Sequence, residues 1–445
     1  MSRAAPRSTL RKLGFALVAA LLALLLVEGG LRGLALVSGQ DWRSVPLPEH
    51  GEYPVVCPVT EGILKLCPED RHGYERVRPE MFLREAERKR VIVVGESFVF
   101  GLGIAEDEAP PAQLEALLGE EAEVLNWGRC GSYAGKLVPA VQAAVDLHPD
   151  LLVLAIGNNE HTMTSYYTGW PARHPVAFYT ASEALGRLQL FGLLGRTVGG
   201  GLPRPSEAFE RQVELDDPVA RAVYSARRRP PDLSLFEDAL ADPEVTRLLE
   251  QEQRLKERIF RSRLRDLVTL AQDAGVPVVL ATLPHRLRTP PALSGIHGGD
   301  PERVRTLVRR LGARGGSAPE ETVRAGIEED PRVAIFLNAW GELALARGDT
   351  ARAAEAFMAQ AEWDLVPDGT PSLNVIVRDL ARERGCALVD LEPLALRSLD
   401  PSMPMFLDRV HVDAAGAALV AATLEPTVRA QLGLGPGAQD GGSPP

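Results

Sequence analysis

Cysteine is scarce in this chain of 445 residues, which contains only four. No spacing of cysteine and histidine resembles a zinc site, and the sequence implies neither a metal nor another cofactor. Cys130 and Cys386 are expected to be small buried residues. Cys57 and Cys67 bracket a short segment that contains proline, so they could close a disulfide loop in an oxidising compartment.

Clusters of basic residues are also rare. Beyond the N-terminus they gather only briefly, at residues 88–90 and 227–229, and the formal net charge of the chain is −11. Nucleic-acid binding needs a broad basic surface. We therefore expect no nucleic-acid partner.

One long apolar run is present, at residues 13–37. It is long enough to span a bilayer, and its two charged residues, Glu28 and Arg32, are four apart and can pair on one helix face. The preceding residues are basic, which keeps the N-terminus in the cytoplasm. We expect the chain after about residue 38 to lie outside the cytoplasm, in the periplasm or the extracellular space.

A cleaved secretory signal is the alternative for this run, because residues 13–27 alone have the length of a signal-peptide core. No small-residue cleavage site follows Val27 directly, which favours a retained anchor. Residues 1–38 are therefore predicted to form a cytoplasmic tail and a single transmembrane anchor. Either interpretation exports the rest of the chain.

Alternating strand and helix patterns begin at residue 90, after a proline-rich linker or collar at residues 39–89. Short buried strands alternate with amphipathic helices, which is typical of a parallel α/β sheet. The predicted strands are residues 91–94, 123–126, 151–156, 276–281 and 387–391, and the predicted helices are residues 112–118, 136–147, 250–274, 372–384 and 412–432.

Two segments interrupt this rhythm. Residues 158–248 carry aromatic residues and a Pro/Arg-rich stretch, and they could form a lid over the sheet or a surface excursion. Residues 300–364 are predicted to be helical, with a Gly348-Asp349 turn between two amphipathic helices that resemble a tetratricopeptide hairpin. This hairpin could be structural or could bind a protein partner. Residues 433–445 are rich in Gly and Pro and are expected to be disordered.

Polar residues with catalytic chemistry follow several of these strands. Ser97 follows the first strand in Gly-Glu-Ser, where a hydroxyl can face the crevice at the carboxyl ends of the strands. Glycines after the second strand, Gly131 among them, let the backbone approach a ligand, and Asn159 after the third could place an amide beside the crevice. Asp408 and His411 stand three apart before the last helix, so the carboxylate can orient the imidazole as a base.

These four motifs, in this order, resemble the SGNH (GDSL-type) hydrolase family over residues 90–432, apart from the two interruptions. The resemblance implies a flavodoxin-like three-layer α/β sandwich with about five parallel strands and a helical hairpin insertion. It implies Ser97 as the nucleophile, His411 as the general base and Asp408 as the residue that orients it. The implied oxyanion donors are the backbone N–H groups of Ser97 and Gly131 and the side chain of Asn159.

The chain departs from the family pattern at two carboxylates. Glu96 stands where the family's Gly-Asp-Ser has aspartate, and Glu160 stands where Gly-x-Asn-Asp has aspartate. Both substitutions keep the carboxylate on a longer arm. They put the packing around the site in doubt and leave the nucleophile in place.

The implied activity is serine-dependent ester hydrolysis through an acyl-enzyme. Because the domain is exported and anchored, the expected substrate is an O-acyl ester of an envelope glycan or lipid. An O-acyltransferase that modifies an exported polysaccharide is the close alternative. A further hypothesis is a catalytically silent anchored scaffold whose helical insertion binds a protein partner.

Overall fold

The structure is a computed structural model of the chain. It describes residues 7–38, 56–59, 63–66, 88–160, 185, 188–190, 193–194, 239–312, 319–367, 369, 371–400 and 405–435. The chain divides into two compact units, Met1–His50 with Arg173–Glu210, and Gly51–Ala172 with Arg211–Pro445.

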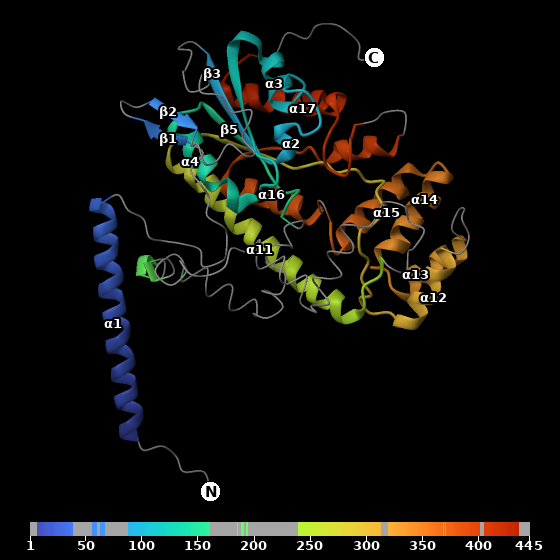
Figure 1. Cartoon of the computed structure of the whole chain (residues 1–445), viewed down its shortest axis with the longest axis horizontal. Helices are drawn as coiled ribbons and strands as arrows, with labels where there is room; N and C mark the ends of the chain where they lie inside the picture. Colours follow the sequence, from blue (N-terminus) through green and yellow to red (C-terminus); the bar gives the residue numbers. More distant parts are fainter. Residues whose placement is uncertain are drawn as a thin grey trace. The chain divides into compact units, whose positions relative to one another are not determined.

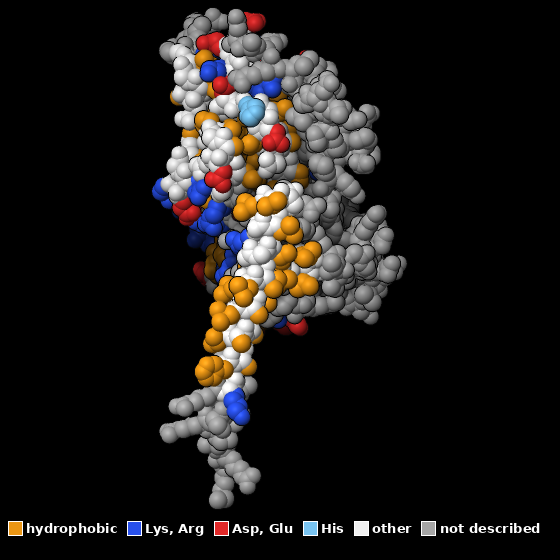
Figure 2. All heavy atoms as spheres, turned by 90° about the vertical axis from the view of Figure 1, so that its left-hand side faces the viewer, with side chains coloured by type: hydrophobic (Ala, Val, Ile, Leu, Met, Phe, Trp, Pro, Cys, Tyr) orange, Lys and Arg blue, Asp and Glu red, His pale blue; other side chains and the backbone are white. Residues whose placement is uncertain are grey.

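The N-terminal apolar run forms one helix, α1 (Arg7–Ser38). Its stretch Val18–Ser38 is long and apolar enough to cross a membrane. Hydrophobic side chains cover the face of this helix that Figure 2 presents. Exposing so much apolar surface to water is unfavourable, whereas a bilayer would cover it. The helix has the properties of a membrane anchor or a signal sequence.

The two charged residues of this run are paired, as the sequence predicts. Arg32 Nε donates to Glu28 Oε1 at 2.8 Å, one helical turn away. Glu28 also accepts hydrogen bonds from the backbone N–H groups of Gln189 and Leu190, both at 3.0 Å and in the same unit. These three donors satisfy the carboxylate, which reduces the cost of carrying a charge within an apolar helix.

The second unit is built on a five-stranded sheet in the order β4-β3-β5-β6-β7, with every pairing parallel (Figure 1). The chain runs outward from β3 to β4 and then crosses back to β5, so the strand order reverses between β3 and β5. Crevices form at the carboxyl ends of strands beside such a reversal. The strands are β3 (Lys89–Gly95), β4 (Ala122–Gly128), β5 (Leu151–Ala155), β6 (Val278–Ala281) and β7 (Ala387–Val389).

Helices cover both faces of this sheet, which gives three layers. Strand residues point alternately to the two faces. Ile92 and Val94 pack with α4, α11 and α16, and Val91 and Val93 pack with α2, α3 and α17. These helices are α4 (Val138–Asp146), α11 (Pro243–Asp273), α16 (Pro371–Arg384), α2 (Ser97–Phe100), α3 (Pro110–Leu118) and α17 (Ala414–Leu432). The predicted α/β sandwich with five parallel strands is confirmed.

Element boundaries differ from the predicted ones where polar side chains end or start an element. β3 begins at Lys89, before the apolar run, because the buried Arg90 pairs with Glu123 of the neighbouring strand at 2.6 Å. The helix predicted to start at residue 250 starts at Pro243, because the Asp242 side chain caps it by accepting from the N–H groups of Glu244 and Val245.

Short 3-10 helices occupy Gly119–Glu121, Ala134–Leu137 and Glu392–Leu399.

The predicted linker contains a small antiparallel sheet. β1 (Val56–Val59) pairs with β2 (Ile63–Leu66), with Cys57 opposite Lys65. Cys67 lies outside the described residues, so its disulfide with Cys57 stays a prediction. Within the described part of the chain, Cys386 is a free thiol. The other cysteine described there with its side chain is Cys130. Both are half-buried rather than fully buried as the sequence suggested.

The second interruption of the α/β pattern is helical. It contains α12 (Pro301–Gly312), α13 (Glu320–Glu329), α14 (Ala334–Ala346) and α15 (Thr350–Trp363). Gly348, with a φ of 77°, ends the turn between α14 and α15, and the Asp349 side chain caps α15. Phe336 packs with α12 and α13, whereas Phe357 packs with Leu287 and the Glu392–Leu399 helix. The hairpin therefore buries its faces within the described part of this unit.

The first interruption, residues 158–248, is described only in small part. Residues 243–248 belong to α11. Most of the remainder, including the aromatic and Pro/Arg-rich stretches that suggested a lid, lies outside the described residues, as do residues 436–445 of the predicted tail.

Candidate active site

The turn after β3 places Ser97 at the carboxyl edge of the sheet, as the first residue of α2. The turn is tight. A Cβ atom at Gly95 would lie 2.4 Å from the carbonyl oxygen of Ala155 and 2.3 Å from Cγ2 of Val99. Only glycine fits there, which lets the chain leave the strand directly beside β5 and turn at once into the helix.

The loop before α17 holds Asp408 and His411 in one turn. Asp408 Oδ1 accepts from the backbone N–H groups of Val410 and His411, at 2.9 and 2.8 Å. Its Oδ2 lies 2.6 Å from Nδ1 of the His411 ring. The N–H of Leu407 donates to the carbonyl of His411 at 2.8 Å and closes the loop. The two residues are thus held by the backbone as well as by their side chains.

Ser97 and His411 meet across the edge of the sheet. His411 Nε2 lies 2.7 Å from Ser97 Oγ. Because the Asp408 carboxylate can only accept at Nδ1, the neutral ring carries its proton there and leaves Nε2 to accept the serine proton. The structure therefore brings together Ser97, His411 and Asp408 with the geometry of a nucleophile, a base and the group that orients it.

The charge of Asp408 favours this arrangement. Burial alone would raise its pKa, but the hydrogen bonds from the ring and backbone of His411 and from the backbone of Val410 outweigh burial and lower the pKa to about 2. The carboxylate is therefore ionised throughout the neutral range. An ionised partner at Nδ1 favours the imidazolium form of a histidine ring.

The two other residues expected to bind the oxyanion lie on loops at the same edge. Gly131, with a φ of 67°, follows β4, and Asn159 follows β5. Asn159 Nδ2 donates to the carbonyl of Ser132 at 2.7 Å, which ties the two loops together. This bond fixes the direction of the amide group.

Glu96 joins the nucleophile turn to the loop after β5. Its Oε1 accepts from the backbone N–H of Gly157 at 2.9 Å, and its Oε2 accepts from that of Asn158 at 3.1 Å. Complete burial and the nearby Glu160 raise its pKa well above the usual value, although these backbone donors oppose the shift. The longer arm that departs from the family pattern thus connects two loops of the site.

Glu160 makes a similar connection to the loop after β4. It is buried, and its Oε1 accepts from the backbone N–H of Ala134. The sequence places both glutamates near the site but does not reveal their hydrogen-bond partners. The partners donate through the backbone N–H, so their side chains give no sign of the bond.

No group of three or more His, Cys, Asp or Glu residues in the described part of the chain could hold a metal ion. The side chains that meet at the carboxyl edge of the sheet are a serine hydroxyl, an imidazole and a carboxylate. Such a set matches attack on a carbonyl carbon, in which the base needs to move one proton and the donors need to stabilise one negative oxygen.

Comparisons with known proteins give matches only among solved structures; neither a family model nor a curated protein matches the chain. A carbohydrate acetylesterase family member from Sinorhizobium meliloti is 16% identical, with 78% of this chain and 100% of that chain covered and a TM-score of 0.29. A lipase/acylhydrolase from Enterococcus faecalis is 12% identical, with 77% and 96% covered and a TM-score of 0.32. A GDSL-like lipase from Bacteroides thetaiotaomicron is 11% identical, with 78% and 91% covered and a TM-score of 0.32.

The descriptions of these matched proteins are those of esterases and lipases, the class that the four motifs predicted.

Proposed function

We propose that this chain is a serine-dependent ester hydrolase that works through an acyl-enzyme. The observation that carries the proposal is the pair of hydrogen bonds that joins Ser97 Oγ to His411 Nε2 at 2.7 Å and His411 Nδ1 to Asp408 Oδ2 at 2.6 Å. This order of groups prepares a hydroxyl for nucleophilic attack, because the base is in contact with the proton that it must remove.

In the proposed reaction, Ser97 Oγ attacks the carbonyl carbon of an ester while His411 Nε2 takes the hydroxyl proton. The carbonyl oxygen becomes an oxyanion, and the N–H groups of Ser97, Gly131 and the Asn159 amide stabilise it. The intermediate collapses when the C–O bond to the alcohol breaks and His411 returns the proton to the leaving oxygen. Water then attacks the acyl-enzyme by the same route and releases the carboxylic acid and Ser97.

Helix α1 supports a location for this activity. We propose that it anchors the protein in a membrane, with the basic N-terminus in the cytoplasm and the α/β unit outside. A substrate in that compartment would be an O-acylated glycan or lipid of the envelope. Carbonate extraction tests the anchor, and protease accessibility of the α/β unit in cells with a permeabilised outer layer tests its side. Digestion only after lysis of the inner membrane would contradict this orientation.

Hydrolysis of 4-nitrophenyl acetate by the full-length protein in detergent tests the activity itself. We expect turnover that Ser97→Ala abolishes, and labelling by a fluorophosphonate that the same variant loses. Ser38→Ala, which removes an exposed hydroxyl from α1, is the matched control and should keep both. Full activity in Ser97→Ala would refute the proposal. A phenotype that survives Ser97→Ala but not disruption of the α14–α15 hairpin would instead favour a scaffold.

Transfer of the acyl group to a sugar hydroxyl is the alternative, and it shares the acyl-enzyme. The two outcomes separate at the second step, where water or a glycan accepts the acyl group. An acceptor polysaccharide is added, and the acyl groups on the glycan and the free acid in solution are both measured. Their ratio compares transfer to the glycan with hydrolysis by water. Acylated glycan in excess over free acid would assign a transferase.

A further inference from the structure

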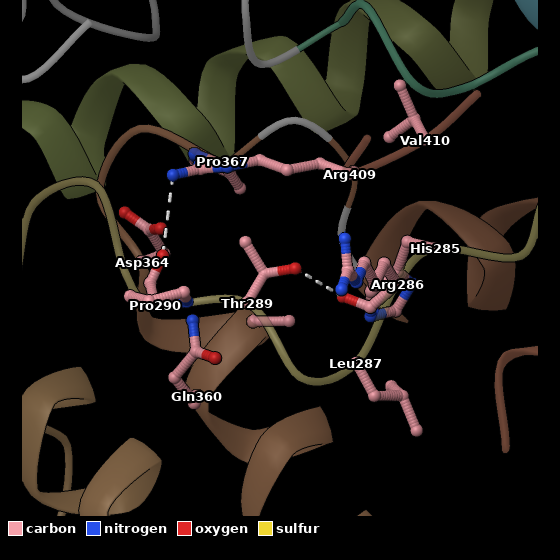
Figure 3. Close-up of a pocket in the computed structure, with 12 residues that line it drawn as sticks. His285, Arg286, Leu287, Thr289, Pro290, Gln360, Asp364, Pro367, Arg409 and Val410 are labelled. Carbon is pink, nitrogen blue, oxygen red and sulfur yellow. Dashed lines mark hydrogen bonds between the residues drawn. The ribbon is translucent and has the colours of Figure 1, made fainter. Parts of the chain in front are cut away.

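A small hollow lies against the loop that carries Asp408 and His411. It has a volume of about 30 Å³ and is open on one side. Its walls come from three parts of the chain (Figure 3): the loop after β6, the end of α15 with the residues that follow it, and Arg409 and Val410 of the catalytic loop. None of these segments is near another in sequence, so only the fold creates the hollow.

The hollow shares its wall with the catalytic loop. Arg409 and Val410 stand between Asp408 and His411, and the N–H of Arg286 donates to the carbonyl of Arg409 at 2.8 Å. Gly369 lines the same wall, and a Cβ atom there would lie 3.0 Å from Asn158 Oδ1 and 3.8 Å from Val410 Cγ1. A molecule in the hollow would therefore contact the loop that carries the base, although neither Ser97 nor His411 lines the hollow itself.

An unpartnered amide faces into the hollow. Gln360 is only 4% exposed, yet its side chain makes no hydrogen bond to any described residue. Figure 3 shows its amide directed from α15 toward the space below Arg409. Neither amide atom of Gln360 is among the fully buried, unpaired side-chain atoms of the described residues, so the amide is accessible from the hollow.

Two arginines give the hollow a positive character within an acidic protein. Arg286 is exposed at its edge and forms no ion pair with the described residues. The Arg409 side chain stretches along the opposite side, where it makes a long bond of 3.4 Å to the carbonyl of Pro290 (Figure 3). Guanidinium groups bind carboxylates and phosphates through paired N–H donors.

One of these two charges, that of Arg409, acts on the carboxylate of Asp364: burial raises the pKa of Asp364, and Arg409 opposes that rise. Asp364 is the one carboxylate among the lining residues, and its oxygens already accept from the backbone N–H groups of Ala292, Leu293 and Val366. Burial lowers the pKa of His285 to about 4, despite the nearby Glu392, so this imidazole is neutral at pH 7. The lining then carries two positive charges and one negative charge.

We propose that this hollow binds an anionic group, a carboxylate or a phosphate, on the alcohol portion of the ester substrate. The inference rests on the proposed hydrolase function, because it assigns the hollow to the substrate of Ser97. Arg286 supplies the paired donors at the open edge, and the Gln360 amide supplies a donor from the floor. The anionic group would thereby hold the ester beside the catalytic loop.

Three matched acetate esters test the proposal: those of methyl glucoside, methyl glucuronoside and methyl glucoside 6-phosphate. We expect kcat/KM to be about tenfold higher for at least one anionic ester than for the neutral ester, the usual scale of a charge-assisted contact. The carboxylate and phosphate arms show which anion the hollow takes. Arg286→Gln and Gln360→Ala should reduce this ratio at least severalfold, mainly through KM. Arg310→Gln, which removes an exposed arginine of α12, should preserve it.

Equal kcat/KM values for the neutral and anionic esters would overturn the inference, as would a preference that Arg286→Gln leaves intact. Either result could occur with normal hydrolysis of 4-nitrophenyl acetate, so the proposed function would survive. If no ester is hydrolysed, calorimetry of the Ser97→Ala protein with glucuronate and with glucose 6-phosphate tests the hollow alone. Binding that Arg286→Gln weakens would support the hollow, and absence of binding would refute it.

Discussion

The imidazole of His411 lies 2.7 Å from the hydroxyl of Ser97, although 314 positions separate the two residues in the chain. Ser97 follows the strand β3, and His411 belongs to the loop that precedes the last helix. Both lie at the carboxyl edge of the parallel sheet. The contact therefore depends on the whole α/β unit being folded, and it makes the serine the most informative residue to change.

Asp408→Asn tests the role of the carboxylate. The amide would favour the wrong tautomer of His411 and would not stabilise the imidazolium, so we expect kcat for 4-nitrophenyl acetate to fall by about 10²–10⁴. Because the pKa of Asp408 is lowered to about 2, its ionisation should not limit the rate above about pH 3. Glu355→Gln, at an exposed position of α15, is the control. A wild-type rate in Asp408→Asn would contradict the assigned role.

The same lowered pKa predicts how stability depends on pH. The folded protein keeps Asp408 ionised below the unfolded value of 3.8, so the stabilisation is present above that pH and is lost as pH falls through about 2. It should amount to about 1 kcal/mol, because solvent screens this half-exposed group. Urea unfolding of wild-type and Asp408→Asn proteins between pH 2 and 6 should show a difference that disappears toward pH 2. A difference independent of pH would be inconsistent with this origin.

Glu96→Ala would break the connection between the nucleophile turn and the loop after β5. It leaves the buried N–H groups of Gly157 and Asn158 without their acceptors, so we expect the free energy of unfolding to fall by about 2–4 kcal/mol. Because Asn159 follows on the same loop, kcat should fall too. Glu355→Ala, an exposed change on α15, should alter stability by less than about 0.5 kcal/mol. Equal stabilities of the Glu96→Ala and Glu355→Ala proteins would refute the structural role.

Glu362 predicts a dependence of stability on pH with the opposite sign. Burial and the nearby Glu257 and Glu392 raise its pKa to about 7, although the N–H and hydroxyl of Ser372 oppose the shift. The folded protein therefore holds this proton more tightly than the unfolded chain, and stability falls as pH rises from 4.5 to 7. Glu362→Gln removes the effect. The free energy of unfolding of the Glu362→Gln protein minus that of wild type should rise by about 2–3 kcal/mol between pH 4.5 and 7.

The matched change Glu355→Gln, at an exposed position of α15, controls for the loss of one carboxylate. Its difference from wild type should stay constant between pH 4.5 and 7. If Glu362→Gln gives the same flat profile, the carboxyl group of Glu362 is ionised normally in the folded protein and the assigned burial effect is absent.

Gly95→Ala tests the tight turn that presents Ser97. The new methyl group would lie 2.4 Å from the carbonyl oxygen of Ala155, and backbone cannot move there without separating β3 from β5. We expect a loss of stability of more than about 2 kcal/mol, by the overpacking of a filled core, together with loss of activity. Gly435→Ala, where no atom would lie within 4 Å of the added Cβ, should unfold like wild type. Thermal unfolding followed by circular dichroism compares the two, and a wild-type melting temperature for Gly95→Ala would contradict this account of the turn.

Much of the fold follows from local sequence patterns. The run Val91–Val94 is buried on both faces, and such runs mark strands of a parallel sheet even without knowledge of their neighbours. Asp349 before α15 is likewise a cap that the sequence displays directly. Local patterns do not reveal a boundary that a side chain from elsewhere decides, as at Arg90, whose partner Glu123 is 33 residues away.

The sequence by itself determined the class of the fold, the apolar helix near the N-terminus, and the residue types and order of Ser97, Asn159, Asp408 and His411. Those features are recorded in hydrophobic periodicity and in short motifs, which act over a few neighbouring residues. Tertiary structure alone decided the distance between Ser97 and His411, the attachment of Glu96 to the loop after β5, and the hollow between Arg286, Gln360 and Arg409. Each of these depends on strand order and on helix packing, and the free energies that fix them come from contacts between segments far apart in the chain.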